Sequence, residues 1–108
     1  MITINIKRND KNEIIKFSLE GHAGFATSGN DIVCAGVSAI TNMIIIGFEK
    51  LKIMPKFEKN DDGFLSFELP SNLTEEQNNK IQYLLECMTE EFMDIQRNYS
   101  KYVKVKEN

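Results

Sequence analysis

The stretch ITINIKRNDKNEIIKFSLE, residues 2–20, decides the fold of this chain. Apolar residues alternate with polar ones in two of its segments, over residues 2–8 and 13–20. The alternating apolar positions are Ile2, Ile4 and Ile6 in the first segment and Ile15, Phe17 and Leu19 in the second. A period of two is typical of a strand with one buried face, and the polar run at 9–12 is typical of a turn. We therefore predict a β-hairpin whose apolar face needs a covering layer.

Two helices are predicted to supply that layer. The first runs from about Asp31 or Cys34 to about Lys52, with apolar residues at helical spacing. Those residues are Val37, Ile40, Ile44, Phe48 and Leu51. The second helix begins at TEEQ, residues 74–77, a pattern typical of a capping box. Its apolar stripe consists of Ile81, Leu84, Leu85, Met88, Phe92, Ile95 and Tyr99.

A second hairpin is predicted between the helices. Residues 53–59 and 64–69 flank NDDG at 60–63, and Asp-Gly between two extended runs favours a tight turn. The predicted order is ββαββα, and residues 102–105 fit a short final strand as well. This order indicates an α+β fold, a two-layer sandwich with a mostly antiparallel sheet and the helices on one face. With 108 residues, we expect a single domain over residues 1–108.

The charge of the chain limits its partners. Its 13 basic and 16 acidic side chains give a net charge of -3. Phosphate backbones bind basic surfaces, so we expect no direct nucleic-acid ligand, whereas a basic protein would be attracted. No continuous apolar run approaches the ~20 residues that cross a bilayer. The N-terminus lacks the basic start and apolar core of a signal peptide, so we expect a cytoplasmic protein without membrane contact.

The chain has two cysteines, Cys34 and Cys87, and one histidine, His22. In the reducing cytoplasm both thiols are expected to be free. Two cysteines are too few for a disulfide framework, and one histidine leaves a zinc site short of ligands. We therefore expect no metal and no cofactor. Cys87, beside Glu86 on the second helix, is expected to be structural, with a Cys34–Cys87 redox switch as the alternative.

Cys34 is the candidate nucleophile. It is predicted within the first turn of the first helix, where unpaired N–H groups and the helix dipole favour negative charge. That setting lowers the pKa of a thiol, and the same N–H groups can hold an oxyanion. His22, at the end of the second predicted strand, is the candidate base because the chain has no other imidazole. Such a cysteine is nevertheless also common as a small buried residue, and such a histidine as a surface or core residue.

The residues around this pair have alternative roles. Asp31 is predicted either to cap the helix or to orient His22. Ser38, one turn beyond Cys34, would steady the thiol or a substrate, or bond back to the Cys34 carbonyl. The composition of GHAGFATSGN, residues 21–30, favours a mobile loop, and we interpret it as a lid that orders over substrate. The glycines of this segment are Gly21, Gly24 and Gly29.

The motifs GHA at 21–23 and DIVCAGVS at 31–38 resemble those of the ribosomal-processing cysteine proteases of Firmicutes and related bacteria. Chain length and element order agree with that family in outline. The resemblance implies an enzyme that removes a short N-terminal extension from a protein of the large ribosomal subunit. It also implies cleavage just after a pair of aromatic residues, which exposes the mature end needed in the ribosome.

The resemblance further implies roles for single residues. Cys34 would be the nucleophile and His22 the base, while Asp31 and Ser38 occupy positions associated with the active site. Members of the family are homodimers, and the loop after the histidine is thought to move on substrate binding. The apolar residues predicted to contact the aromatic side chains are Phe25, Ile32 and Val33. The alternatives are a non-catalytic ribosome-associated protein, a thiol hydrolase or acyltransferase acting on small esters or amides, and a redox-sensing thiol.

Overall fold

Seven elements make up the part of the chain that the structure describes. The computed structural model describes residues 1–21 and 28–108, without the side chains of residues 28–31. The elements are β1 (Ile2–Arg8), β2 (Ile14–Glu20), α1 (Ser28–Lys50), β3 (Lys56–Lys59), β4 (Leu65–Glu68), α2 (Glu75–Asn98) and β5 (Val103–Glu107). The predicted α+β order is confirmed, and the short final strand is present as β5.

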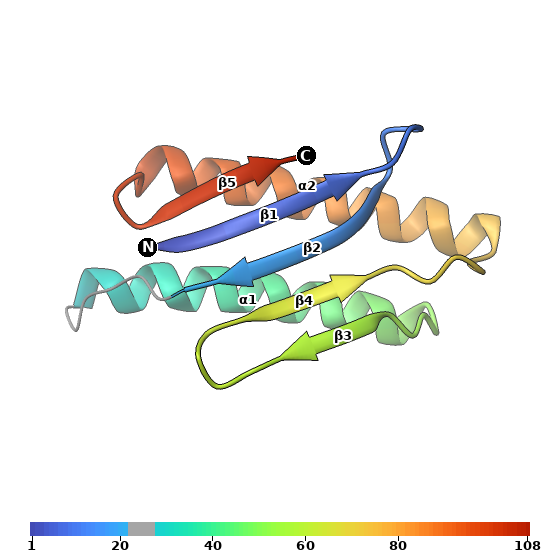
Figure 1. The fold of residues 1–108 in the computed structure, drawn as a ribbon, viewed down its shortest axis with the longest axis horizontal. Helices are drawn as coiled ribbons and strands as arrows, with labels where there is room; N and C mark the ends of the chain where they lie inside the picture. The colour runs from blue at the N-terminus through green and yellow to red at the C-terminus, as the bar shows by residue number, and fades with distance from the viewer. Residues whose placement is uncertain (22–27) are drawn as a thin grey trace.

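The strands form one mostly antiparallel sheet. Their order is β3-β4-β2-β1-β5, and only the β1–β5 pair among the described strands is parallel. Figure 1 shows both helices on the same side of this sheet. The predicted two-layer arrangement is therefore confirmed.

The core lies between the sheet and the helices. The Phe17 ring stacks on Phe67 and Phe92, with ring centroids 5.8 and 5.6 Å away, and so joins β2 to β4 and to α2. Residues with no more than 1% of their surface exposed come from both layers. They are Ile4, Ile6, Ile14, Ile44, Ile81, Met88, Phe92 and Val103.

One strand departs from the predicted alternation. The register between β1 and β2 shifts, so that Lys7 pairs with Lys16 while Arg8 pairs with Ile14. Ile15 is thus the extra residue of a β-bulge, so the side chains before it change face relative to the alternation that Phe17 and Leu19 follow after it. Ile14 therefore reaches the core, with 1% of its surface exposed, whereas Ile15, predicted to lie on the apolar face, is only half-buried.

The two helix starts differ in how well they follow from sequence. The capping box of α2 is confirmed: Thr74 Oγ1 accepts from the Gln77 N–H at 3.0 Å, and Gln77 Oε1 accepts from the Thr74 N–H at 2.9 Å. The predicted start of α1 is wrong, because this helix begins at Ser28. Gly/Ser-rich composition is only a weak local preference, which the packing of a long helix overrides.

Arg8 ties the sheet to α2. Its guanidinium donates to Glu86 through Nη1 at 2.6 Å and Nη2 at 2.8 Å, a bidentate contact. The hydrogen bonds from Arg8 hold the pKa of Glu86 below its usual range. The stabilisation from this pair is present above the ordinary carboxyl pKa and is lost as the pH falls through the lowered one.

By length and composition, the segment Ile32–Lys50 of α1 qualifies as a membrane span, contrary to the expectation that no stretch approaches that size. The core helix of a soluble protein passes the same test. Here α1 also packs one of its faces into the core, through Val33, Val37, Ile44 and Phe48.

We expect Phe92→Ala to lower the free energy of unfolding by about 3–5 kcal/mol, because it empties a fully buried site against the Phe17 ring. Tyr83→Ala is the control, since Tyr83 lies on the same helix but is 73% exposed. It should cost less than about 0.5 kcal/mol. Urea unfolding followed by circular dichroism measures both, and equal losses would contradict the assigned core.

Candidate active site

Cys34 lies in a cleft at one end of the sheet. On α1 it is placed between Val33 and Val37, which are 2% and 3% exposed, and it is itself half-buried. The cleft has a volume of about 430 Å³. Its other described lining residues are Val37, Ser38, Thr41 and Asn42 of α1, Ile2 and Leu19 of the sheet, Gly21 directly after β2, and Lys59, Asn60, Gly63, Phe64 and Leu65 of the second hairpin. The buried valines fix the rotation of the helix and so direct Cys34 into this cleft.

The predicted place of Cys34 in the first helical turn is wrong. Because α1 begins at Ser28, Cys34 is its seventh residue. The unpaired N–H groups of a helix belong to its first turn, and the effect of the dipole falls off over that turn. The backbone amide of Cys34 is therefore inside the helix and is not free to bind an oxyanion.

Ser38 is brought together with Cys34, as the sequence predicts. It is exposed and lines the same cleft, one turn further along α1. Asn42 continues this wall by another turn and is also exposed. Thr41, in contrast, donates its hydroxyl to the Val37 carbonyl at 2.8 Å and is buried. Ser38 and Asn42 are thus the polar side chains that α1 presents to a ligand in the cleft.

The structure does not describe the side chains of several predicted site residues. His22, Gly24 and Phe25 lie outside the described residues, and Gly29 and Asp31 are described only as backbone of α1. The predicted roles of His22, Gly24 and Phe25 stay predictions. Gly29, expected in the flexible loop, instead belongs to α1, and Asp31 lies inside that helix and so is not its N-cap. Gly21 is described, and it lines the Cys34 cleft directly before His22 in the sequence.

Two residues predicted to contact substrate aromatics do not line the Cys34 cleft. Val33 is buried in the core, and Ile32 is 61% exposed. Both border a separate apolar groove of about 440 Å³ between α1 and α2. The apolar lining beside Cys34 comes instead from Ile2, Leu19, Phe64 and Leu65.

The hairpin residues of the cleft were missed by sequence reasoning. The NDDG pattern predicts a turn at 60–63, and Asn60 does open that turn. Nothing local in the sequence says that β4 pairs with β2, yet this pairing carries the turn to the end of β2 and thus to Cys34. The sequence therefore predicts the turn, but it does not predict that the turn lies beside the end of β2.

Cys87 is on a different surface. It is exposed on α2 among acidic side chains, which are Glu86, Glu90, Glu91 and Asp94. Cys87, expected to be structural, is thus not buried in the core. Both thiols are free. Among the residues with described side chains, no three His, Cys, Asp or Glu side chains are grouped to hold a metal ion.

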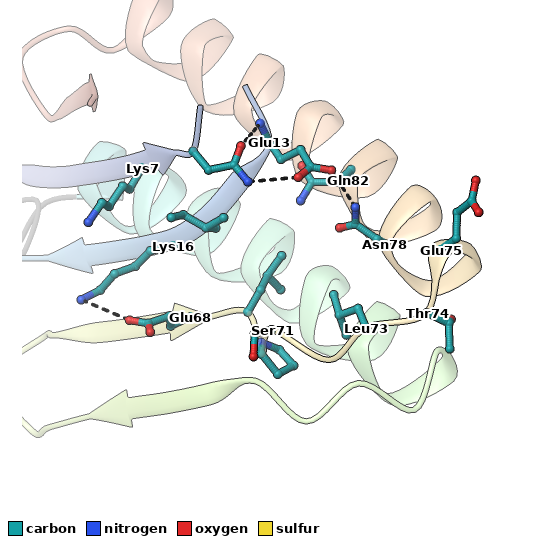
Figure 2. Close-up of a pocket in the computed structure, with 14 residues that line it drawn as sticks. Lys7, Glu13, Lys16, Glu68, Ser71, Leu73, Thr74, Glu75, Asn78 and Gln82 are labelled. Atoms are coloured by element: carbon teal, nitrogen blue, oxygen red, sulfur yellow. Dashed lines mark hydrogen bonds and ion pairs between the residues drawn. The ribbon is translucent and has the colours of Figure 1, made fainter. Parts of the chain in front are cut away.

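A larger cavity, of about 730 Å³, lies at the opposite end of the sheet (Figure 2). Three of its polar side chains are engaged: Asn78 donates to Glu13 at 2.7 Å, and Gln82 exchanges hydrogen bonds of 2.8 and 2.7 Å with the Ile14 backbone. Hydrogen bonds from Asn9 and Asn78 hold the pKa of Glu13 below its usual range. These groups are already paired, and no cysteine is among the residues that line this cavity.

The family described as Cysteine protease Prp matches residues 1–104 of the chain. The chain is 37% identical over 114 residues to the ribosomal processing cysteine protease Prp of Bacillus subtilis (strain 168), with 100% of the chain and 98% of that protein covered. It is 30% identical over 108 residues to the protein of the same name from Staphylococcus aureus (strain Mu50 / ATCC 700699), with 97% of each covered.

The fold is also similar to a solved structure. The crystal structure of the essential ribosomal processing protease Prp from S. aureus, in complex with a covalently linked product peptide, superposes with a TM-score of 0.85. The two chains are 25% identical, and 100% of each is covered.

The exposure of the two thiols and the proposed activation of Cys34 predict opposite orders of alkylation for Cys34 and Cys87. Cys87 is exposed and Cys34 half-buried, so accessibility alone would let Cys87 react first. The thiolate is the reactive form, so an activated Cys34 would reverse that order. We expect iodoacetamide near neutral pH to label Cys34 before Cys87, and His22→Ala to slow labelling at Cys34 alone. Peptide mass spectrometry gives both rates, and faster labelling of Cys87 in the unmodified chain would contradict the assignment.

Proposed function

The chain belongs to the Prp family of cysteine proteases, and on that basis we propose that it removes a short N-terminal extension from a protein of the large ribosomal subunit. The observation that carries the proposal is the position of Cys34. Its thiol is half-buried in a cleft that also contains Gly21, the residue directly before His22. The S. aureus relative holds a covalently linked product peptide, which supports a covalent route in this chain as well.

The proposed reaction uses Cys34 and His22. His22 takes the proton of the Cys34 thiol, and the thiolate attacks the carbonyl carbon of the scissile bond. The tetrahedral intermediate collapses as the protonated His22 gives its proton to the leaving amine. Water, activated by His22, then attacks the carbonyl carbon of the thioester. This attack releases the acyl product and restores the thiol. In this scheme Asp31 orients His22, because as the fourth residue of α1 it lies inside the helix and is not its N-cap.

The oxyanion needs donors other than the backbone amide of Cys34, because that amide lies inside α1. Ser38 and Asn42 are exposed along the wall of the cleft, on the same side of α1 as Cys34. We assign them as the side chains that donate to the substrate carbonyl or to its neighbours. Such donors act most strongly where water is excluded, as in a cleft that the substrate fills.

The apolar lining of the cleft fits cleavage after aromatic residues. Leu19, Phe64 and Leu65 offer apolar surface beside Cys34, and the side chain of the residue before the cut would be buried against it. The net charge of -3 complements a basic ribosomal protein and would speed encounter. In this proposal the enzyme acts in the cytoplasm, and its product has the mature end needed in the ribosome.

The protease proposal predicts one defined cut. Incubation with the extended ribosomal protein should release one N-terminal peptide, detected by mass spectrometry of both products. Cys34→Ala and His22→Ala should abolish the cut, because they remove the nucleophile and its base. Cys87→Ala is the matched control and should retain it. Cutting by both active-site variants would exclude this mechanism, and binding without cutting by the unmodified chain would favour the accessory-protein alternative.

We also propose a homodimer formed through α1. The outward face of this helix is apolar along its length, and Ile32, Met43 and Ile46 are 61%, 49% and 51% exposed. Ala35 and Ala39 continue the same exposed stripe. No charged residue occurs between Asp31 and Glu49. A two-fold axis would place this stripe against its own copy and remove it from water.

Met43→Glu should dissociate the dimer, because a carboxylate would be buried in the contact. Size-exclusion chromatography with light scattering should then give half the mass of the unmodified protein. Tyr83→Glu, an equally severe change at an exposed position of α2, is the control and should stay dimeric. A monomeric unmodified protein that sediments with lipid vesicles would instead assign the stripe to a membrane surface.

A further inference from the structure

We propose that the turn between β3 and β4 positions the catalytic base, His22. In this proposal Asn60 fixes the shape of the turn, and the turn fixes Gly21, the residue directly before His22. The inference rests on the proposed function, and it adds a residue that acts through another rather than on the substrate. Asn60, Gly63 and Gly21 all line the Cys34 cleft.

Asn60 holds the turn through its side chain and its backbone. Its Oδ1 accepts from the Asp62 N–H at 2.8 Å and from the Phe64 N–H at 3.2 Å. Its own N–H donates to the Phe64 carbonyl at 3.1 Å. An amide side chain that bonds to backbone groups two and four residues ahead restricts the turn to one shape.

The shape of this turn determines where Gly63 presents its carbonyl. Gly63 has a φ of +86°, a conformation that L side chains rarely adopt. Its carbonyl accepts from the Gly21 N–H at 3.2 Å. The turn is thus bonded across the sheet to the residue that follows β2.

Gly21 is constrained from two further directions. Its φ is +95°, and a Cβ at this position would collide with the Met1 carbonyl oxygen. The residue therefore has to be glycine, and it is held between Gly63 on one side and the chain start on the other. In the sequence His22 follows this constrained residue directly, so a change in the turn would be passed to the start of the segment that bears the imidazole.

The chain contains a matched control for this arrangement at the other end of the sheet. In the β1–β2 turn, Asn9 Oδ1 accepts from the Lys11 N–H at 3.0 Å and from the Glu13 N–H at 2.9 Å. The Asn9 N–H donates to the Glu13 carbonyl at 2.9 Å. This turn has the same pattern of bonds but lines the cavity of Figure 2, away from Cys34.

We expect Asn60→Ala to lower kcat for the extended ribosomal protein by about 10- to 100-fold with little change in KM, as for a catalytic group displaced by about 1 Å. It should also slow iodoacetamide labelling of Cys34. Asn9→Ala should change kcat and the rate of Cys34 labelling by less than about 2-fold. It should shift the urea midpoint at least as far as Asn60→Ala does, because it loses the matching side-chain bonds of its turn and one bond to Glu13 as well. Asn60→Asp, which keeps the acceptor oxygen, should recover most of the rate.

The outcomes separate this inference from the proposed function. If the unmodified chain does not cut, the proposed function fails, and Cys34 labelling alone decides the positioning role. Equal effects of Asn60→Ala and Asn9→Ala on labelling would overturn that role. A rise in KM with unchanged labelling would also overturn it, because Asn60 would then be a substrate contact.

Discussion

Burial of one face of α1 against one face of the sheet is the constraint on which the candidate active site depends. Val37, Ile44 and Phe48 enter the core and are at most 3% exposed, so they set the rotation of the helix. Once that rotation is set, Cys34 and Ser38 can face only the gap at the end of the sheet. Cys34, the proposed nucleophile, is therefore positioned by packing. Core interiors are close-packed, so this kind of positioning leaves little freedom.

The two ends of the sheet show the difference between a structural polar cluster and a site. At the end drawn in Figure 2, Glu13, Asn78 and Gln82 are engaged with each other or with the backbone. At the other end, Ser38 and Asn42 are exposed on the wall of a cleft that also holds a free thiol. Polar groups that are already paired stabilise a fold, whereas exposed groups converging on a cleft are available to a ligand.

Several elements were predictable because their signals are local. The alternation of Ile2, Ile4 and Ile6 identified β1, and the Thr74–Gln77 capping box identified the start of α2. The start of α1 was not predictable, since Gly/Ser-rich composition disfavours a helix only weakly and a long packed helix outweighs it. The bulge at Ile15 was missed for a related reason: it depends on the register of two strands, and one strand alone shows only its alternation.

For the site, the sequence by itself determined the residue types and their order: one imidazole, a thiol twelve positions later, and a hydroxyl one helical turn beyond the thiol. Side-chain chemistry and helical periodicity are local properties, so they can be read along the chain. Only the tertiary structure decided that Cys34 lies in the second turn of its helix and that Leu19, Asn60 and Leu65 form the cleft around it. Those facts depend on the pairing of β4 with β2 and on the packing of α1 below them, and both arise from contacts between segments far apart in the sequence.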